Sequence, residues 1–270
     1  MNEQSIVSGN AVKISATIIT LNEEKKIEPC LLSLEGVADE IIVVDSGSTD
    51  RTEEICRKYN VTFITHAFEG YVRQKNFAMK QASYDIILSL DADERLSAGL
   101  RESILAAKKN WGEISGYLVN RRNNYCGKWI RFCGWYPDRK IRLWDRRVGR
   151  WTGEDPHDKV TLEGKAAGQL KGDLLHMTFY TMDEHLRQMH KFAEVAAKAK
   201  YKSGKKPVFL IHVLLSPLFK FFRKYIVQLG FLDGYYGFVV CTTASALTFY
   251  KYLRVYEYHR RDAQTAKQGN

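Results

Sequence analysis

Three acidic side chains follow one apolar stretch of this sequence. Residues 89–96 read SLDADERL and come directly after YDIIL, residues 84–88. Carboxylates this close together repel, and near a low-dielectric core at least one would tend to bind a proton. A divalent cation would remove the repulsion, and oxygen ligands suit Mg²⁺ or Mn²⁺. The spacing of Asp91 and Asp93 therefore predicts a metal site, with an acidic turn that caps the next helix as the alternative.

A second polar cluster, DSGSTD, occupies residues 45–50. A carboxylate such as that of Asp45 can accept hydrogen bonds from ribose hydroxyls or from a base N–H, and the small residues that follow let a ligand approach. Asp50 is instead suited to cap the helix that comes next. We therefore expect Asp45 to contact a ligand and Asp50 to be structural.

The predicted secondary structure explains how such clusters could meet. Apolar strands are predicted at residues 13–21, 40–45, 61–65 and 84–90, and they alternate with helices near Pro29, after residue 50 and at 70–82. This alternation indicates an α/β fold with an open sheet of parallel strands, whose ligands bind beyond the carboxyl ends of the strands. That rule brings Asn22, Asp45 and Asp91 to one edge of the sheet.

The second half of the chain has a different texture. A strand is predicted at residues 115–125 and a helix at 183–201, and residues 207–258 are aromatic-rich and apolar. We expect a catalytic domain at residues 1–180 and a helical C-terminal region at 181–270. The longest uncharged run, between Asp233 and Lys251, favours an interfacial or core helix over a transmembrane helix.

Composition narrows the class of protein. The chain has 270 residues, 45% of them hydrophobic, and a formal net charge of +10, which favours a polyanionic partner such as nucleic acid, a nucleotide-like substrate or an anionic membrane face. Five cysteines without a CxxC pair argue against a zinc site or a disulfide framework and favour a reducing compartment. Residues 1–10 show no signal-peptide pattern.

Several stretches together carry a family resemblance. TLNEE, IIVVDSGSTDRT and GYVRQKNFAMKQASYDIILSLDADE resemble the family 2 glycosyltransferases, an inverting group with the GT-A fold. YPDRKIRLWDRR, PHDKVTLEG, GDLLHMTFYTMDEHLRQMHKFA and FLDGYYGF are similar to a narrower branch, the lipopolysaccharide core glycosyltransferases of the WaaE type. The resemblance implies a GT-A core and an inverting transfer of a hexose, with UDP-glucose favoured as donor. The acceptor would be a lipid-linked saccharide such as lipopolysaccharide core, and the cofactor a divalent metal, Mg²⁺ or Mn²⁺.

The resemblance also implies roles for individual residues. The metal would be held by Asp93 and Asp91, and His176 either completes this site, contacts phosphate or is only a hydrogen-bonded strand residue. Residues expected to bind the nucleotide sugar, including its diphosphate, are Leu21, Asn22, Glu23, Asp45, Arg73, Lys75, Asn76, Asp91 and Arg142. For Arg142 the alternative is a pair with a carboxylate of the acidic cluster. Metal and cations would neutralise the charge that develops on the leaving nucleotide diphosphate.

Inverting transfer also needs a general base for the acceptor hydroxyl. The segment GEDPHD, residues 153–158, offers three acids. The branch usually has His-Glu where this chain has His157 and Asp158, and another part of the family uses an acid in a Glu-Asp pair, which Glu154 and Asp155 would mimic. We predict Asp158 as the base, with Asp155 as the second candidate.

Two other functions compete with this interpretation. A polyprenyl-phosphate acceptor would need little base catalysis, and the basic, aromatic segment 128–151 could bind nucleic acid by stacking and phosphate contacts. No nucleic-acid-binding module accompanies that segment, so no nucleic acid is expected. Basic residues flank the apolar C-terminal faces, which suits an anionic membrane surface, with a plain helical cap as the alternative. The predicted location is cytoplasmic, peripheral at the inner face of the cell membrane.

Overall fold

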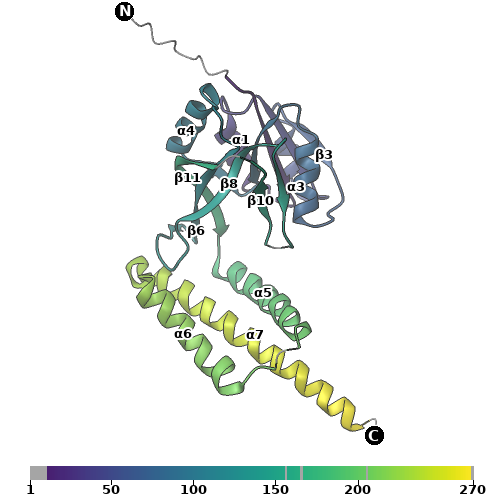
Figure 1. Cartoon of the computed structure of the whole chain (residues 1–270), viewed down its shortest axis with the longest axis vertical. Coiled ribbons are helices and arrows are strands. Elements are labelled where there is room, and N and C mark those ends of the chain that lie inside the picture. The colour runs from purple at the N-terminus through teal and green to yellow at the C-terminus, as the bar shows by residue number, and fades with distance from the viewer. Residues whose placement is uncertain (1–10, 156, 165–166, 205, 269–270) are drawn as a thin grey trace, which may run out of the picture. The chain divides into compact units, whose positions relative to one another are not determined.

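The computed structural model describes residues 11–155, 157–164, 167–204 and 206–268 (Figure 1). Residues 1–10, for which no signal peptide is predicted, lie outside the described residues. The chain divides into two compact units, one of Met1–Arg122 with Pro137–Met177 and the other of Asn123–Tyr136 with Thr178–Asn270. The second unit therefore includes a segment from the middle of the chain, which no sequence pattern indicated.

A mixed sheet forms the first unit. Strands β3 (Thr62–Thr65), β2 (Glu40–Asp45), β1 (Ile14–Thr20) and β4 (Ile86–Asp91) are parallel neighbours in that order. The sheet continues through β8 (Asp138–Asp145), β6 (Gly116–Tyr125), β11 (Ala167–Phe179) and β5 (Glu94–Leu96), with antiparallel β4–β8, β8–β6 and β11–β5 pairs. Strands β6 and β11 run on into the second unit, where β7 (Lys128–Trp129) pairs with β6. A separate hairpin joins β9 (Gly149–Thr152) to β10 (Lys159–Leu162).

The four predicted strands are present within two residues of their expected ends, and all four are parallel. Helices α1 (Ile27–Leu34) and α3 (Tyr71–Lys80) also match the prediction, whereas α2 (Thr52–Cys56) ends before Tyr59. The Tyr59 amide donates to the Cys56 carbonyl in a turn, and the Tyr59 hydroxyl donates to the Glu28 carboxylate. This side-chain bond is one that helical periodicity does not reveal.

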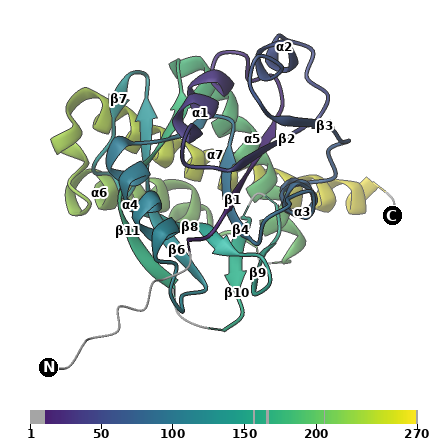
Figure 2. The same ribbon diagram turned by 90° about the horizontal axis from the view of Figure 1, so that it is seen from above.

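Apolar residues on both faces explain why the parallel strands lack polar alternation. On one face, β1 and β4 pack against α1 and α4 (Ala98–Lys109). On the other face, β2 packs with α3 and with Trp144 and Trp151. Figure 2 shows α3 on the opposite side of β1 and β4 from α1 and α4. Register places Asp45 beside Thr20 and Asp91 beside Ile19, so the carboxyl ends of β1, β2 and β4 meet at one edge.

The second unit is mainly helical. A capping box at Thr181 and Glu184 begins α5 (Met182–Lys202). The chain then forms two π-helical segments, η1 (Phe209–Leu215) and η2 (Arg223–Val227), on either side of α6 (Ser216–Phe222). A short 3₁₀ turn, η3 (Gly230–Asp233), precedes the long helix α7 (Gly234–Gln268), which packs against α5 and α6. Among the residues the structure describes, no helix combines the length and apolar character that a membrane span requires.

Candidate active site

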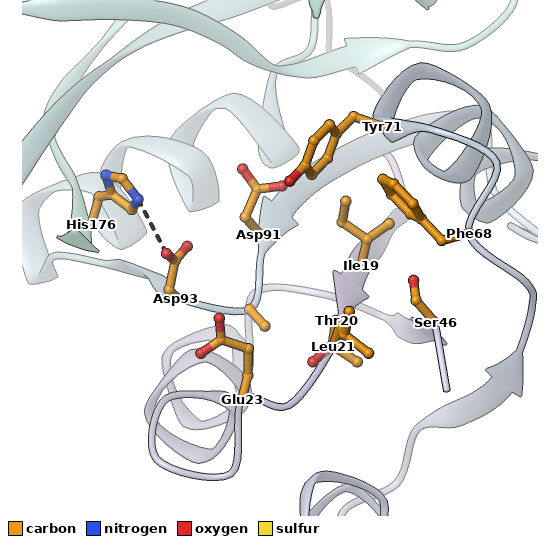
Figure 3. A pocket seen from close by; sticks show the side chains of 11 residues that line it. Ile19, Thr20, Leu21, Glu23, Ser46, Phe68, Tyr71, Asp91, Asp93 and His176 are labelled. Atoms are coloured by element: carbon orange, nitrogen blue, oxygen red, sulfur yellow. Dashed lines mark ion pairs between the residues drawn. The ribbon is translucent and has the colours of Figure 1, made fainter. Parts of the chain in front are cut away.

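A cavity of about 360 Å³ opens at the carboxyl ends of β1 and β4 (Figure 3). Three acids face it, Glu23, Asp91 and Asp93, together with His176 from β11. We call it the acidic cavity. Its other lining residues are Ile19, Thr20, Leu21, Ser46, Phe68, Tyr71 and Ala92.

Two loops that shape this edge are joined by hydrogen bonds. Asn22 has a left-handed backbone, with φ of 55°, and its side-chain oxygen accepts from the Thr49 amide at 2.8 Å. The Asn22 amide in turn donates to Ser48 Oγ at 2.8 Å. Asparagine tolerates this conformation better than most residues, which explains its use at the end of β1. The predicted ligand Asn22 therefore acts as a loop connector here and does not line the cavity.

Asp45 is buried and also shapes a turn. Its Oδ2 atom accepts from the Gly47 and Ser48 amides at 2.9 and 2.8 Å. Asp50 is structural, as expected, because it accepts from the Glu24 and Thr52 amides, although the N-cap of α2 is Arg51 and not Asp50. Asp45 sits at the end of β2 next to the cavity residue Ser46, but it is not among the cavity's lining residues.

The repulsion between the closely spaced acids is largely relieved by the protein itself. Glu94 is fully buried, and Arg142 Nη2 contacts its carboxylate at 2.7 Å and that of Asp91 at 3.2 Å. Lys75 Nζ lies 2.9 Å from the other Asp91 oxygen. Burial would raise the pKa of Asp91, but the charges of Lys75 and Arg142 outweigh it and hold that pKa well below its ordinary value. For Asp91 and Glu94, cations of the protein itself thus relieve the repulsion that a bound metal was expected to remove.

Asp93 has a different environment from Asp91. It lies in the turn between β4 and β5, so the two side chains are not presented by one extended segment as expected. Asp93 Oδ2 lies 3.2 Å from His176 Nε2 (Figure 3). It also lies 4.0 Å from Lys26 Nζ. Lys26 also contacts Glu23 at 3.2 Å. Burial raises the pKa of Glu23, although Lys26 opposes the shift.

Lys75 connects the acidic cavity to a second one. Its Nζ lies 2.8 Å from Asp158 Oδ2 as well as 2.9 Å from Asp91, and it sits 4.3 Å from the centre of the Trp151 ring. Asp158 lines this second cavity, of about 500 Å³, which Asp91 also borders. Cationic side chains dominate its lining, so we call it the basic cavity. Its lining residues are Lys75, Asp91, Leu118, Arg121, Arg139, Lys140, Ile141, Arg142, Trp151, His157, Asp158, Lys159 and Val160.

Asp155 has a structural position. Its carboxylate accepts hydrogen bonds from the Tyr71 and Val72 amides, at 3.0 and 3.3 Å, at the start of α3. Gly70, with φ of 110°, precedes that helix, and a Cβ at this position would come within 2.2 Å of Asp155 Oδ2. A carboxylate at this position accepts hydrogen bonds from amides that have no partner within the helix. Its negative charge also interacts favourably with the positive end of the helix dipole. Asp155 lines neither cavity.

The sequence of the sheet matches a known family. Residues 15–151 match the model of the family described as "Glycosyl transferase family 2". The match covers half of the chain and includes β1 to β4 with the acidic turn. This chain belongs to glycosyl transferase family 2. Membership confirms the predicted family and its GT-A fold class, with a helical C-terminal region.

Relatives of this glycosyltransferase extend over nearly its whole length. It is 33% identical over 262 residues to the lipopolysaccharide core biosynthesis glycosyltransferase LpsC of Rhizobium meliloti, covering 93% of this chain and 94% of that protein. It is 30% identical to an uncharacterized glycosyltransferase of Rickettsia bellii, over 90% and 85% of the two chains. A solved structure, glucosyl-3-phosphoglycerate synthase of Mycobacterium tuberculosis with Mn²⁺ and UDP, aligns over 42% of this chain and 44% of that chain, at 25% identity and a TM-score of 0.36.

The predicted site residues of this glycosyltransferase fall into two groups. Those that line one or both cavities are Leu21, Glu23, Lys75, Asp91, Asp93, Arg142, Asp158 and His176. Those that line neither are Asn22, Asp45, Arg73, Asn76 and Asp155. Arg73 is exposed and pairs with Glu69 at 3.5 Å. Asn76 donates to and accepts from the backbone of Trp151, which fastens β9 to α3.

Sequence reasoning missed several residues at this site. Tyr71 and Phe68 line the acidic cavity, and their rings contact each other edge to face with centroids 5.1 Å apart. Arg121, on β6, contacts Glu94 at 3.4 Å. Tyr71 precedes the predicted cations of α3, so its position in GYVRQKN offered a signal. Arg121 had none, because its proximity to Glu94 depends on strand order in the second half of the sheet.

Proposed function

We propose that this enzyme transfers a hexose, with glucose favoured, from a nucleotide-diphosphate sugar to a lipid-linked saccharide of the lipopolysaccharide core type, with inversion. The observation that supports this most directly is the acidic cavity itself. It gathers Glu23, Asp91, Asp93 and His176 at the carboxyl edge of a parallel sheet, where such folds bind their ligands. The long match to a lipopolysaccharide core glycosyltransferase supports the acceptor class.

The side chains that face the acidic cavity include ligands that suit a divalent metal. Asp93 offers carboxylate oxygens and His176 an imidazole nitrogen, 3.2 Å apart, and both face the acidic cavity. No group of three or more His, Cys, Asp or Glu among the described residues could enclose a metal alone, so waters and diphosphate oxygens would supply the remaining ligands. When bound, Mn²⁺ or Mg²⁺ would stabilise negative charge on the leaving diphosphate.

Asp158 is our candidate for the general base. It lines the basic cavity on the far side of Lys75 from Asp91, so an acceptor hydroxyl in that cavity would lie within reach of a carboxylate. Lys75 holds this carboxylate at 2.8 Å, and the Trp151 ring in turn lies against Lys75. Asp155 is less suited to the role because two helix amides already occupy its oxygens.

The second unit supports attachment to an anionic membrane surface. Residues 207–232 contain Lys220, Arg223 and Lys224 and no acid. Large apolar side chains in this stretch are exposed by half or more, among them Leu210, Leu218, Phe219, Phe222 and Val227. Exposed apolar side chains beside cations are typical of segments that lie in the headgroup region of a bilayer. We infer that the enzyme acts as a peripheral protein at the cytoplasmic face of the membrane.

Nucleotide binding provides the direct test of the donor and the metal. Isothermal titration calorimetry of the full chain should show UDP binding that requires Mn²⁺ or Mg²⁺, and a thermal-shift panel of nucleotide sugars should single out a UDP-hexose. Asp93→Asn should weaken metal-dependent UDP binding by more than about 100-fold, since even outer-shell changes cost 10- to 100-fold. Asp85→Asn is the matched control, because Asp85 precedes the same strand at its opposite end and is half exposed. Equal UDP binding by the two variants would overturn the metal assignment.

Vesicle sedimentation tests the membrane surface. The full chain should bind vesicles that contain phosphatidylglycerol, and Leu218→Ser with Phe219→Ser should reduce binding by about tenfold or more, because two exposed apolar side chains are removed. Val195→Ser, at an exposed apolar position on α5, is the control. Undiminished vesicle binding by the double variant would contradict this surface.

A further inference from the structure

The basic cavity contains more positive charge than its own acids balance. Six cationic side chains line it, and four of them have carboxylate partners. Lys75 and Arg142 contact Asp91, Arg121 contacts Glu94 and Asp138, and Lys140 contacts Asp138 at 3.2 Å. With Asp158 on Lys75, four cations face four carboxylates. The four positive and four negative charges of this network therefore balance.

Two lining cations remain outside that balance. Arg139, on β8, and Lys159, on β10, are both exposed and have no acidic partner among the described residues. They come from different elements, and β10 packs against β8 (Figure 2). Two lining cations without acidic partners leave this cavity with an excess of positive charge, which attracts anions. Such a pair indicates an anionic ligand.

We propose that Arg139 and Lys159 form a subsite for a phosphate group on the acceptor saccharide. A phosphate monoester carries a charge near −2 at neutral pH, which matches the two unpaired cations, whereas a carboxylate would balance only one. Arginine can bind two phosphate oxygens at once and lysine adds a point charge. This inference rests on the proposed function, because it assigns the same acceptor a charged group.

The subsite would position the acceptor for the reaction. Asp158 lines the same cavity, so an acceptor held by its phosphate would have its hydroxyls confined near the candidate base. The acidic cavity is a poor place for that phosphate, since Glu23, Asp91 and Asp93 would repel it unless a metal were bound. Arg139 and Lys159 thus separate acceptor recognition from donor recognition.

Phosphate binding without metal tests the subsite. In the presence of a chelator, ³¹P NMR titration should detect binding of inorganic phosphate and of glucose 6-phosphate to the full chain. Arg139→Gln with Lys159→Gln should weaken both by about tenfold or more, because two charged hydrogen-bond donors are lost. Arg57→Gln with Lys58→Gln removes the same charge from exposed positions outside both cavities and should leave binding unchanged. Equal binding by the two double variants would overturn the inference.

Further measurements separate the possible sources of the phosphate. Metal-dependent UDP binding should be the same in both double variants; selective loss in Arg139→Gln with Lys159→Gln would assign the cavity to the donor and overturn the inference. If Arg139→Gln with Lys159→Gln loses binding to phosphatidylglycerol vesicles but still binds glucose 6-phosphate, the two cations bind lipid headgroups. That result would also overturn the inference. If wild-type protein binds no UDP with any metal, the proposed function fails, whereas the phosphate titration still decides the subsite.

Discussion

Two cavities border Asp91, and they carry opposite charge. The acidic cavity presents Glu23, Asp91 and Asp93 with His176, and Lys26 contacts Glu23 at 3.2 Å and Asp93 at 4.0 Å. The basic cavity presents six cations against two acids of its own lining. One cavity suits a metal and its diphosphate, and the other suits an anion. A single strand end, at β4, separates them.

The connection between the cavities is a chain of charges. Asp158, Lys75, Asp91, Arg142 and Glu94 follow one another through contacts of 2.7 to 3.2 Å. Lys75 and Arg142 are buried, and a charge buried without its partner is costly. This series of ion pairs therefore fixes side chains on both cavities at once. It would position a sugar donor and an acceptor relative to each other.

The largest expected effect concerns the difference in role between the cavities. Asp158→Asn should lower kcat for hexose transfer by about 10²- to 10⁴-fold, the usual contribution of a general base, and leave metal-dependent UDP binding intact. Steady-state transfer to a saccharide acceptor and UDP calorimetry measure the two effects. Undiminished transfer to a polyprenyl phosphate would favour the rival acceptor, whose phosphate oxygen needs little base catalysis.

A smaller effect should follow from breaking the link. Lys75→Met would leave Asp91 and Asp158 without their shared cation and should lower the free energy of unfolding by about 3 kcal/mol at pH 7. Urea denaturation measures this, with Lys80→Met on the exposed side of the same helix as control. A loss equal to that of the control would show that the link does not stabilise the fold.

The same variant has a defined pH dependence. Because the folded pKa of Asp91 is held low, its carboxylate stabilises the wild-type protein above the unfolded value near 4, and this contribution is lost as pH falls through the folded pKa. Removing Lys75 raises the folded pKa, so the deficit of Lys75→Met should be largest near pH 7 and shrink towards pH 4. A deficit that grows on acidification would contradict the assigned cause.

The two cavities were not equally predictable from sequence. The acidic cavity follows from local patterns, because β1, β2 and β4 end in polar residues and parallel strands align those ends. The basic cavity depends on β6, β8 and the β9–β10 hairpin, whose order in space the sequence does not reveal. The sequence pointed to Lys75 as a site cation, but it did not predict the ion pair between Lys75 and Asp158.

Spacing also failed to separate ligand residues from structural ones. Asn22, Asn76 and Asp155 have the right chemistry for a site, yet each is occupied by backbone groups from a distant segment. Such bonds satisfy buried or terminal amides that no local pattern identifies. The division of the chain was similarly hidden, because 123–136 joins the second unit through contacts remote in sequence.

The smallest expected effect distinguishes the two candidate bases. Asp155→Ala should lower the free energy of unfolding by about 1 kcal/mol, as loss of a helix N-terminal cap does, and change kcat for transfer less than about twofold. Asp155→Asn keeps one accepting oxygen and should recover part of the stability. Urea midpoints and transfer rates measured on both variants test this directly. A fall in kcat comparable to that of Asp158→Asn, with little loss of stability, would make Asp155 the base and move the acceptor out of the basic cavity.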